Sequence, residues 1–419
     1  MNTASSSARN RFFSTAFVSA AMTVMLCACP RLEFSSADDH SCPTILAPVP
    51  PPFDAAPAQD VGKFAIQLSA GPTPDVTEMH ADGSGGLWLF GTASQRPWVG
   101  RFDRKGHRLW ENSLEIDAPL HVAAATSDGH VVIVAAALAN DPTPAVAYWL
   151  AADGTVTATV DLPPIAGLAA VAVTEDGLLV AGASAVERVD ATGAAVWSVA
   201  LAPETTATGE VLEIGQLAAR ADGSCIVTYW AGTQADQAAG KARAKALALH
   251  ADGTMMWRYD YQHDDPPYGD YATSGRAEVV LSPTGDVFMV GATPGAFPFF
   301  EVGFIEKVAP QTGESLAKHV FPEPDCDGAV LQAVVVAPDG TLDVAVDREV
   351  FIEFQGQFAE SFFVGRLDAN LQPLTAFAIP FSGGIDPPPA RIAQNCLVWL
   401  GTRAPPHLLR VPTATNGCP

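Results

Sequence analysis

The sequence predicts an all-β protein assembled from repeated units of four antiparallel strands. Three observations support this. Turn dipeptides ending in glycine recur along most of the 419 residues, short apolar runs flank them, and tryptophan returns at one offset from the turns. Hydrophobic residues make up 48% of the chain and charged residues only 16%, which excludes a disordered chain and a coiled coil.

The turn dipeptides form two alternating sets. The first set is Asp82-Gly83, Asp128-Gly129, Asp176-Gly177, Asp222-Gly223, Thr284-Gly285 and Asp339-Gly340. The second set is Lys105-Gly106, Asp153-Gly154, Thr192-Gly193, Asp252-Gly253, Thr312-Gly313 and the variant Ala369-Asn370. Because glycine accepts the positive φ that two-residue hairpin loops need, each dipeptide is predicted to join two strands.

A large apolar residue follows several turns of the second set at the same distance. Trp110, Trp197 and Trp257 each lie four residues after the turn glycine, and Leu374 lies four residues after Asn370. A large side chain at one fixed offset is predicted to be wedged between neighbouring sheets.

Each unit is therefore strand, turn, strand, loop, strand, turn, strand, which is one blade of a β-propeller. Six units begin near Asp75, Leu120, Gly167, Gln216, Gly275 and Gly328. A seventh unit lacks its fourth strand, and the segment 63–68 resembles the missing strand. The sequence thus predicts a seven-bladed β-propeller over residues 63–419, with four antiparallel strands per blade and the last blade closed by the N-terminal strand.

The Asp-Gly turn, the aliphatic strand that ends in Gly and the Gly-x-x-x-Trp outer strand resemble the quinoprotein-type and related tandem β-propeller repeats of bacterial secreted proteins. Some members are outer-membrane lipoproteins that scaffold the assembly of β-barrel proteins. The resemblance implies the fold but no single function, since propellers host many activities. Quinone-dependent relatives usually have eight blades and often a vicinal Cys-Cys, and this chain has neither, so no cofactor is expected.

The first 28 residues resemble a lipoprotein signal peptide. Arg9 and Arg11 precede a mostly apolar stretch at 12–26, which is followed by Leu26-Cys27-Ala28-Cys29. This resembles a bacterial lipobox, in which Cys29 receives the lipid; the alternative is plain secretion with cleavage near Ala28. Residues 29–62 are predicted to form a tether rich in Pro and Ser, and Pro30 after the cysteine favours the outer membrane.

The net charge of −23 excludes two kinds of electrostatic partner. A strongly acidic protein does not bind nucleic acid through a basic face, and anionic lipid headgroups repel it. The sequence therefore predicts an extracytoplasmic protein that is anchored to the membrane by lipid, on the periplasmic or surface face.

Local motifs for catalysis or metal binding are missing from the sequence. The nine His are scattered, and neither His-Glu-x-x-His nor Gly-x-Ser-x-Gly occurs, so no metal site is expected. One loop after the fourth strand of unit four combines Tyr with acidic residues, which can bind a cation or stack on a ligand; a solvated loop is the alternative. The candidate residues for a ligand or partner are Tyr259, Tyr261, His263, Asp264, Asp265, Tyr268, Asp270 and Tyr271.

Five cysteines remain after removal of the signal peptide and lipidation, an odd number in an oxidising compartment. Cys225 lies in an apolar strand and is expected to be a free, buried thiol. Cys42, Cys396 and Cys418 belong near the predicted ring closure, and Cys418 is expected to pair with Cys42 or Cys396.

We expect a non-catalytic binding or scaffold platform for an unidentified protein or cell-surface partner. The alternative is an extracytoplasmic hydrolase or lyase that acts on a carbohydrate or small molecule in the central channel. Converging polar groups at the channel would favour the enzyme, whereas turn residues alone would favour the platform.

Overall fold

In the computed structural model, the described residues all belong to Thr44–Pro419, the second of two units into which the chain divides. They comprise residues 56–57, 62–65 and most of 75–412. Within the last range, gaps of five residues or more lie at 126–130, 136–144, 202–209, 233–242, 262–276, 295–300, 322–326 and 380–396. The predicted signal peptide, Cys29 and most of the tether lie outside the described residues.

Four sheets contain four antiparallel strands each, in sequence order. Unit one holds β3 (Asp75–Ala81), β4 (Leu87–Ala93), β5 (Arg96–Phe102) and β6 (Arg108–Ser113). Unit two holds β7 (Leu120–Ala125), β8 (Val131–Ala135), β9 (Val146–Leu150) and β10 (Val156–Asp161). Unit three holds β11 (Ala170–Thr174), β12 (Gly177–Ala181), β13 (Ala185–Asp190) and β14 (Ala195–Ala200). Unit four holds β15 (Glu210–Ala219), β16 (Cys225–Gly232), β17 (Arg243–Leu249) and β18 (Met255–Asp260).

The next two units repeat this strand order but are joined into one larger sheet. Unit five holds β19 (Ala277–Leu281), β20 (Val287–Pro294), β21 (Glu301–Val308) and β22 (Ser315–Phe321). Unit six holds β23 (Asp327–Val336), β24 (Leu342–Ile352), β25 (Gln357–Leu367) and β26 (Pro373–Ile379). The parallel pair of Val302 and Ala329 joins β21 to β23, and β1 (Ala56–Pro57) pairs in parallel with β26.

The last sheet contains three strands, β27 (Leu397–Thr402), β28 (His407–Pro412) and β2 (Gly62–Ala65). The N-terminal strand β2 pairs antiparallel with β28, so that Gly62 lies opposite Arg410. No helix occurs among the residues that the structure describes.

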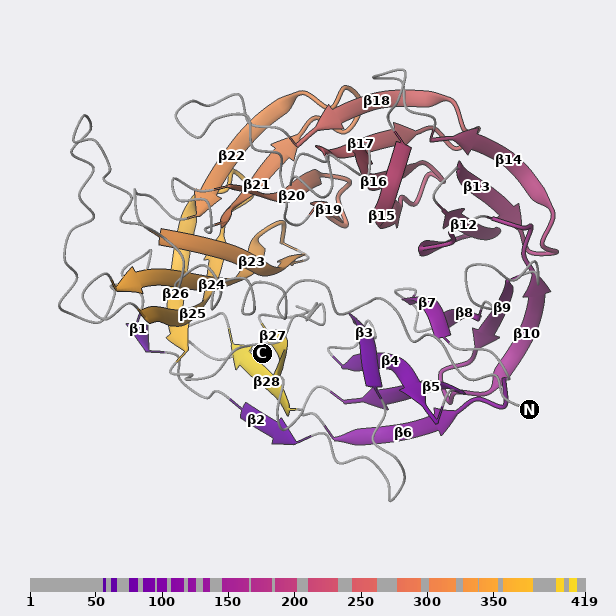
Figure 1. The fold of residues 1–419 in the computed structure, drawn as a ribbon, viewed down its shortest axis with the longest axis horizontal. Coiled ribbons are helices and arrows are strands. Elements are labelled where there is room, and N and C mark those ends of the chain that lie inside the picture. Colours follow the sequence, from indigo (N-terminus) through magenta and orange to yellow (C-terminus); the bar gives the residue numbers. More distant parts are fainter. Residues whose placement is uncertain are drawn as a thin grey trace, which may run out of the picture. The chain divides into compact units, whose positions relative to one another are not determined.

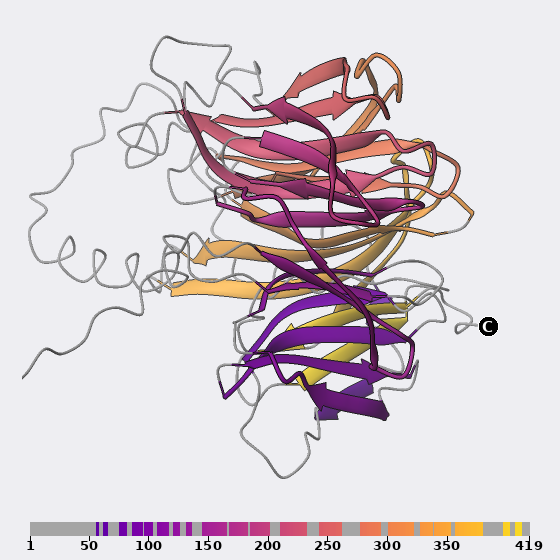
Figure 2. The ribbon, with the colours of Figure 1, turned by 90° about the vertical axis from the view of Figure 1, so that its right-hand side faces the viewer.

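Within Thr44–Pro419, the units follow one another in sequence order around a common centre (Figure 1). The first strand of each unit lies on the inner side, and inner strands of consecutive units contact each other from β3 through β7, β11, β15 and β19 to β23. The fourth strand of each unit lies on the outer side, and the strands of each sheet run side by side in the perpendicular view (Figure 2).

The cores lie between consecutive units. Along β12, Leu178 and Val180 pack against unit two, whereas Leu179 and Ala181 pack against unit four. This arrangement explains why the second strand of a unit is a continuous apolar run: both of its faces are buried.

The turns confirm the predicted positive φ at seven glycines, but the loops are longer than expected. The glycines are Gly154, Gly193, Gly223, Gly253, Gly285, Gly313 and Gly340. In the turn after β9, the Ala151 N–H donates to the carbonyl of Thr155, which leaves three residues in the loop instead of two. A three-residue loop ends in a left-handed residue, the position that glycine fills here.

Two predicted turns are wrong in detail. The turn between β11 and β12 is Glu175-Asp176, and Gly177 begins the next strand without a positive φ. Glycine is needed there for another reason, because a Cβ would lie 2.0 Å from the carbonyl oxygen of Val189. In unit six the left-handed residue is Leu371, with φ 64°, and not Asn370.

The three tryptophans are wedged between units, as predicted. The indole N–H of Trp110 donates to Ala152, that of Trp197 to Ala251 and that of Trp257 to Pro310, each a carbonyl in the turn before the fourth strand of the next unit. The fourth prediction is wrong: Leu374 is 52% exposed. The shifted turn of unit six places Thr375, which pairs with Arg366, at the position that tryptophan occupies elsewhere.

In every outer strand from β6 to β26, a β-bulge lies one residue before the position that the docked tryptophans occupy. The bulged residues include Leu109, Val196, Leu316 and Leu374, each more than half exposed. A bulge redirects the next side chain and blunts an open sheet edge, so it accounts both for the docked tryptophans and for the exposed aliphatic residues.

Cys225 is a free, buried thiol, as predicted. Cys42, Cys396 and Cys418 lie outside the described residues. Within the described part of the chain, no helix is long and apolar enough to cross a membrane.

Candidate functional site

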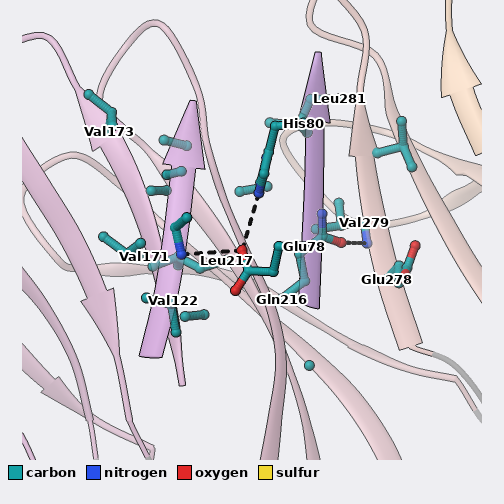
Figure 3. Close-up of a pocket in the computed structure, with 18 of the residues that line it drawn as sticks. Glu78, His80, Val122, Val171, Val173, Gln216, Leu217, Glu278, Val279 and Leu281 are labelled. Atoms are coloured by element: carbon teal, nitrogen blue, oxygen red, sulfur yellow. Dashed lines mark hydrogen bonds and ion pairs between the residues drawn. The ribbon is translucent and has the colours of Figure 1, made fainter. Parts of the chain in front are cut away.

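The inner strands of the six four-stranded units surround a cavity of about 590 Å³. Its wall contains residues of β3, β7, β11, β15, β19 and β23, and it is mostly aliphatic, with side chains such as Val122, Val171, Leu217 and Val279 (Figure 3). Small and β-branched residues suit these strands because neighbouring inner strands lie close together. The cavity volume is typical of a small-molecule site.

Polar side chains are few in this wall, and Glu78 and His80 form a pair on β3 (Figure 3). The Nε2 atom of His80 lies 3.2 Å from Oε2 of Glu78, and both side chains are about one quarter exposed. The His80 ring also packs edge-on against Phe90, with ring centres 5.4 Å apart. These contacts hold both side chains in fixed positions beside the cavity.

Glu78 also links unit one to unit two. The backbone N–H of Ala123, on β7, donates to Glu78 Oε2 at 3.2 Å. An inner strand has one edge without a strand partner, so a side chain from the preceding unit satisfies a backbone group that faces the cavity.

Gln216 makes the corresponding link between units four and five. Its Oε1 accepts a 2.9 Å hydrogen bond from the backbone N–H of Val279, on β19 (Figure 3). The buried hydroxyl of Thr228 supports this arrangement, since it accepts from the N–H of Gln216 and donates to the carbonyl of Ala277. Gly215 is required beside them, because a Cβ would lie 2.6 Å from the Thr228 hydroxyl oxygen.

Two members of the predicted tyrosine-rich loop are part of the packed structure. The Tyr259 hydroxyl donates to Oε2 of the buried Glu306 at 2.6 Å, and the Tyr261 hydroxyl donates to the carbonyl of Glu278 at 2.6 Å. Burial raises the pKa of both tyrosines, so both stay protonated hydrogen-bond donors. Their rings meet edge-on at 5.0 Å, and their two hydrogen bonds connect the end of β18 to unit five.

The other candidates in that loop, His263, Asp264, Asp265, Tyr268, Asp270 and Tyr271, lie outside the described residues. Their role as a ligand or partner loop remains a prediction. Among the residues that are described, no three His, Cys, Asp or Glu side chains are grouped as a metal site requires.

Glu78, His80 and Gln216 were not recognised from the sequence. The signal in the sequence was weak: each is a polar residue inside the inner strand of a repeat, where most other units carry Val or Ala and unit five carries Glu278 at the position of Glu78. That signal depends on knowing which strand of each unit is innermost.

Comparisons with known proteins define the class of fold. No family model matches the sequence, and no curated protein matches it significantly. A structure of catalytically inactive virginiamycin B lyase from Staphylococcus aureus with quinupristin is similar at 11% identity and a TM-score of 0.51, covering 85% of this chain and 99% of that one. A second similar structure, YCF48 bound to D1 peptide, has 13% identity, a TM-score of 0.48 and coverage of 86% and 98%.

The chain therefore has the all-β fold of a β-propeller, in agreement with its repeated antiparallel sheets and with the contacts between consecutive inner strands from β3 to β23. The fold by itself does not fix a function, since β-propellers host both catalysis and binding.

Proposed function

We propose that this protein is a seven-bladed, lipid-anchored β-propeller outside the cytoplasmic membrane that acts as a non-catalytic binding or scaffold platform. The main support for a platform is that polar side chains of the inner wall form hydrogen bonds between units. Glu78 and Gln216 both accept a backbone N–H of the next unit, so they serve to hold neighbouring units together.

Contacts at the outer rim support the same conclusion. In three pairs of units, an indole N–H and an arginine from one unit converge on a single turn carbonyl of the next, and Lys307 reaches Ala369 in a fourth. Links at both the inner and the outer ends of the sheets make a rigid ring, which suits a platform that presents its surface to a partner.

The proposed ring has the three-stranded sheet as its seventh blade. The pairing of β2 with β28 supports closure by the N-terminal strand, because it ties the beginning of the domain to its end. The proposed anchor is the lipid on Cys29, with the residues between Cys29 and β1 as the spacer and the outer membrane as the favoured location.

A photo-crosslinking experiment tests the platform. A photoreactive residue is placed at Leu109, Val196 or Leu316, which are 54%, 55% and 58% exposed. The same residue at Val180, which is fully buried, is the control. We expect a discrete protein or glycan adduct in intact cells from at least one exposed position and none from Val180. If all exposed positions give no adduct, the platform hypothesis is wrong.

An enzyme is the second candidate, and the Glu78–His80 pair favours it. A carboxylate and an imidazole 3.2 Å apart beside a cavity can act as a general acid and base. Cell-envelope extract incubated with the wild-type protein and with His80→Asn would be compared by mass spectrometry. A compound consumed by the wild type but not by the variant would favour the enzyme over the platform.

A further inference from the structure

We infer that the central cavity binds a small free amine, with its ammonium group on Glu78 and its aliphatic body against the surrounding side chains. The inference rests on the proposal that this is a binding protein. It names a class of small ligand for the central cavity, which is separate from the exposed positions proposed for a partner. The observations that lead to it are the carboxylate, the wall and the charge of the chain.

Glu78 has a carboxylate oxygen available to the cavity. Both of its described contacts, with His80 Nε2 and with the Ala123 N–H, use Oε2. Figure 3 shows the second oxygen without a hydrogen bond to the residues drawn. A carboxylate accepts hydrogen bonds at both oxygens, so Oε1 can take a donor from a ligand. Since Oε2 is already held from two sides, the carboxylate is fixed in orientation before a ligand arrives.

The wall around this oxygen determines what kind of donor fits. Valine, alanine and leucine side chains from β7, β11, β15 and β19 form most of it, so an aliphatic ligand body loses water-exposed surface on entry. A cavity of about 590 Å³ accommodates a small organic molecule but not a folded partner. The site therefore combines aliphatic side chains with the oriented carboxylate of Glu78, and Glu278 lines the same cavity.

Charge selects a cation over a neutral donor. The carboxylate of Glu78 is an acceptor that strengthens when its donor is charged. The chain carries a net charge of −23, which raises the local concentration of cations at its surface. An alkylammonium meets both requirements, since aliphatic amines are protonated below about pH 10.

The test is calorimetric titration of the full chain at pH 7.5 with n-hexylamine, n-hexanol and hexanoate. We expect hexylamine to bind about tenfold more tightly than hexanol, because only the ammonium makes a charge-assisted hydrogen bond. Hexanoate is expected to show no binding. Equal affinities for hexylamine and hexanol would contradict the inference, as would the lack of any binding.

Two variants locate the site. Glu78→Gln should lower the affinity for hexylamine about tenfold and leave that for hexanol nearly unchanged. Glu175→Gln is the matched control, since it removes the same charge in the exposed turn between β11 and β12 and should leave both affinities at wild-type values. An equal loss in both variants would mean that hexylamine responds only to the overall negative charge.

A third variant covers the case in which Glu78→Gln weakens the fold. Val173, which lines the cavity, is replaced by Phe to fill part of the space. We expect Val173→Phe to lower the affinity for hexylamine and hexanol together, and unchanged affinities would place binding elsewhere. Failure of these titrations leaves the rim crosslinking result unaffected, so the cavity and the platform are tested separately.

Discussion

The indole nitrogen of Trp197 donates a 2.9 Å hydrogen bond to the carbonyl oxygen of Ala251, which lies in the turn of the next unit. Arg188 donates to the same oxygen at 3.0 Å and is held in place by Asp176. The ring of Trp197 also lies against Gly253, where a Cβ would come within 2.9 Å of it. The docked position of Trp197 thus requires a glycine in the following unit. The same holds for Trp110 with Gly154 and for Trp257 with Gly313.

Removing the docked indole should destabilise the propeller. Trp197→Ala is expected to lower the free energy of unfolding by about 2 kcal/mol, because it loses buried area and a hydrogen bond. The adjacent Val196→Ala is the control and should change stability by less than about 0.5 kcal/mol, since Val196 is 55% exposed. Urea denaturation measures both values, and equal effects would contradict the docking role.

Alanine substitutions at two turn glycines should distinguish the cost of backbone strain from the cost of a steric clash. Gly253 and Gly285 have φ angles of +83° and +91°, but of the two only Gly253 has neighbours within 4 Å of the position that a Cβ would take. Both Gly→Ala changes should cost about 1 kcal/mol for the left-handed backbone. Gly253→Ala should cost about 1–3 kcal/mol more, because the methyl group displaces Trp197. Identical unfolding midpoints for the two variants would show that the contact with Trp197 carries no energy.

The N-terminal strand should matter for the whole domain. Deletion of residues 62–65 removes β2 and leaves the edge of β28 open, so we expect a lower melting temperature and new aggregation. Deletion of residues 35–38 in the predicted tether removes the same number of residues and should change neither. Calorimetry and light scattering measure these effects. An unaltered melting temperature after loss of 62–65 would mean that the ring closes in another way.

The predicted anchor has a direct test. Cys29→Ser should move the protein from the membrane fraction to the soluble fraction while the domain keeps its melting temperature, since a diacylated cysteine supplies the chains needed for stable anchoring. Ser36→Ala, in the predicted tether, is the control and should stay with the membrane. Retention of Cys29→Ser in the pellet after a salt wash would exclude lipid on Cys29 as the anchor.

Cys225 should be chemically inert in the folded protein. Burial raises the pKa of its thiol to about 12. Because the thiolate is the reactive form, almost none is present at pH 8. Iodoacetamide should therefore modify Cys225 only after denaturation, as measured by peptide mass spectrometry. Rapid modification of the native protein at pH 8 would contradict the buried position of this strand.

Most of the repeat could be predicted because its signals are local. A glycine that takes positive φ, such as Gly253, and an apolar run buried on both faces, such as β12, can be recognised within ten residues of sequence. The prediction for the variant turn of unit six was wrong because it also relied on a local signal, a glycine or asparagine at the left-handed position. Leu371 occupies the left-handed position without being glycine, so the offset counted from Asn370 fell on Leu374, one residue before Thr375.

By itself, the sequence determined the strands, their order and the three docked tryptophans, because periodicity and turn chemistry act between near neighbours in the chain. Only the tertiary structure decided which polar groups meet at the centre. Glu78 reaches Ala123 and Gln216 reaches Val279 across 45 and 63 residues, and no pattern within one unit reports such a pair. These two links form because a backbone N–H at the free edge of an inner strand needs an acceptor, and the preceding unit supplies it once the units pack together.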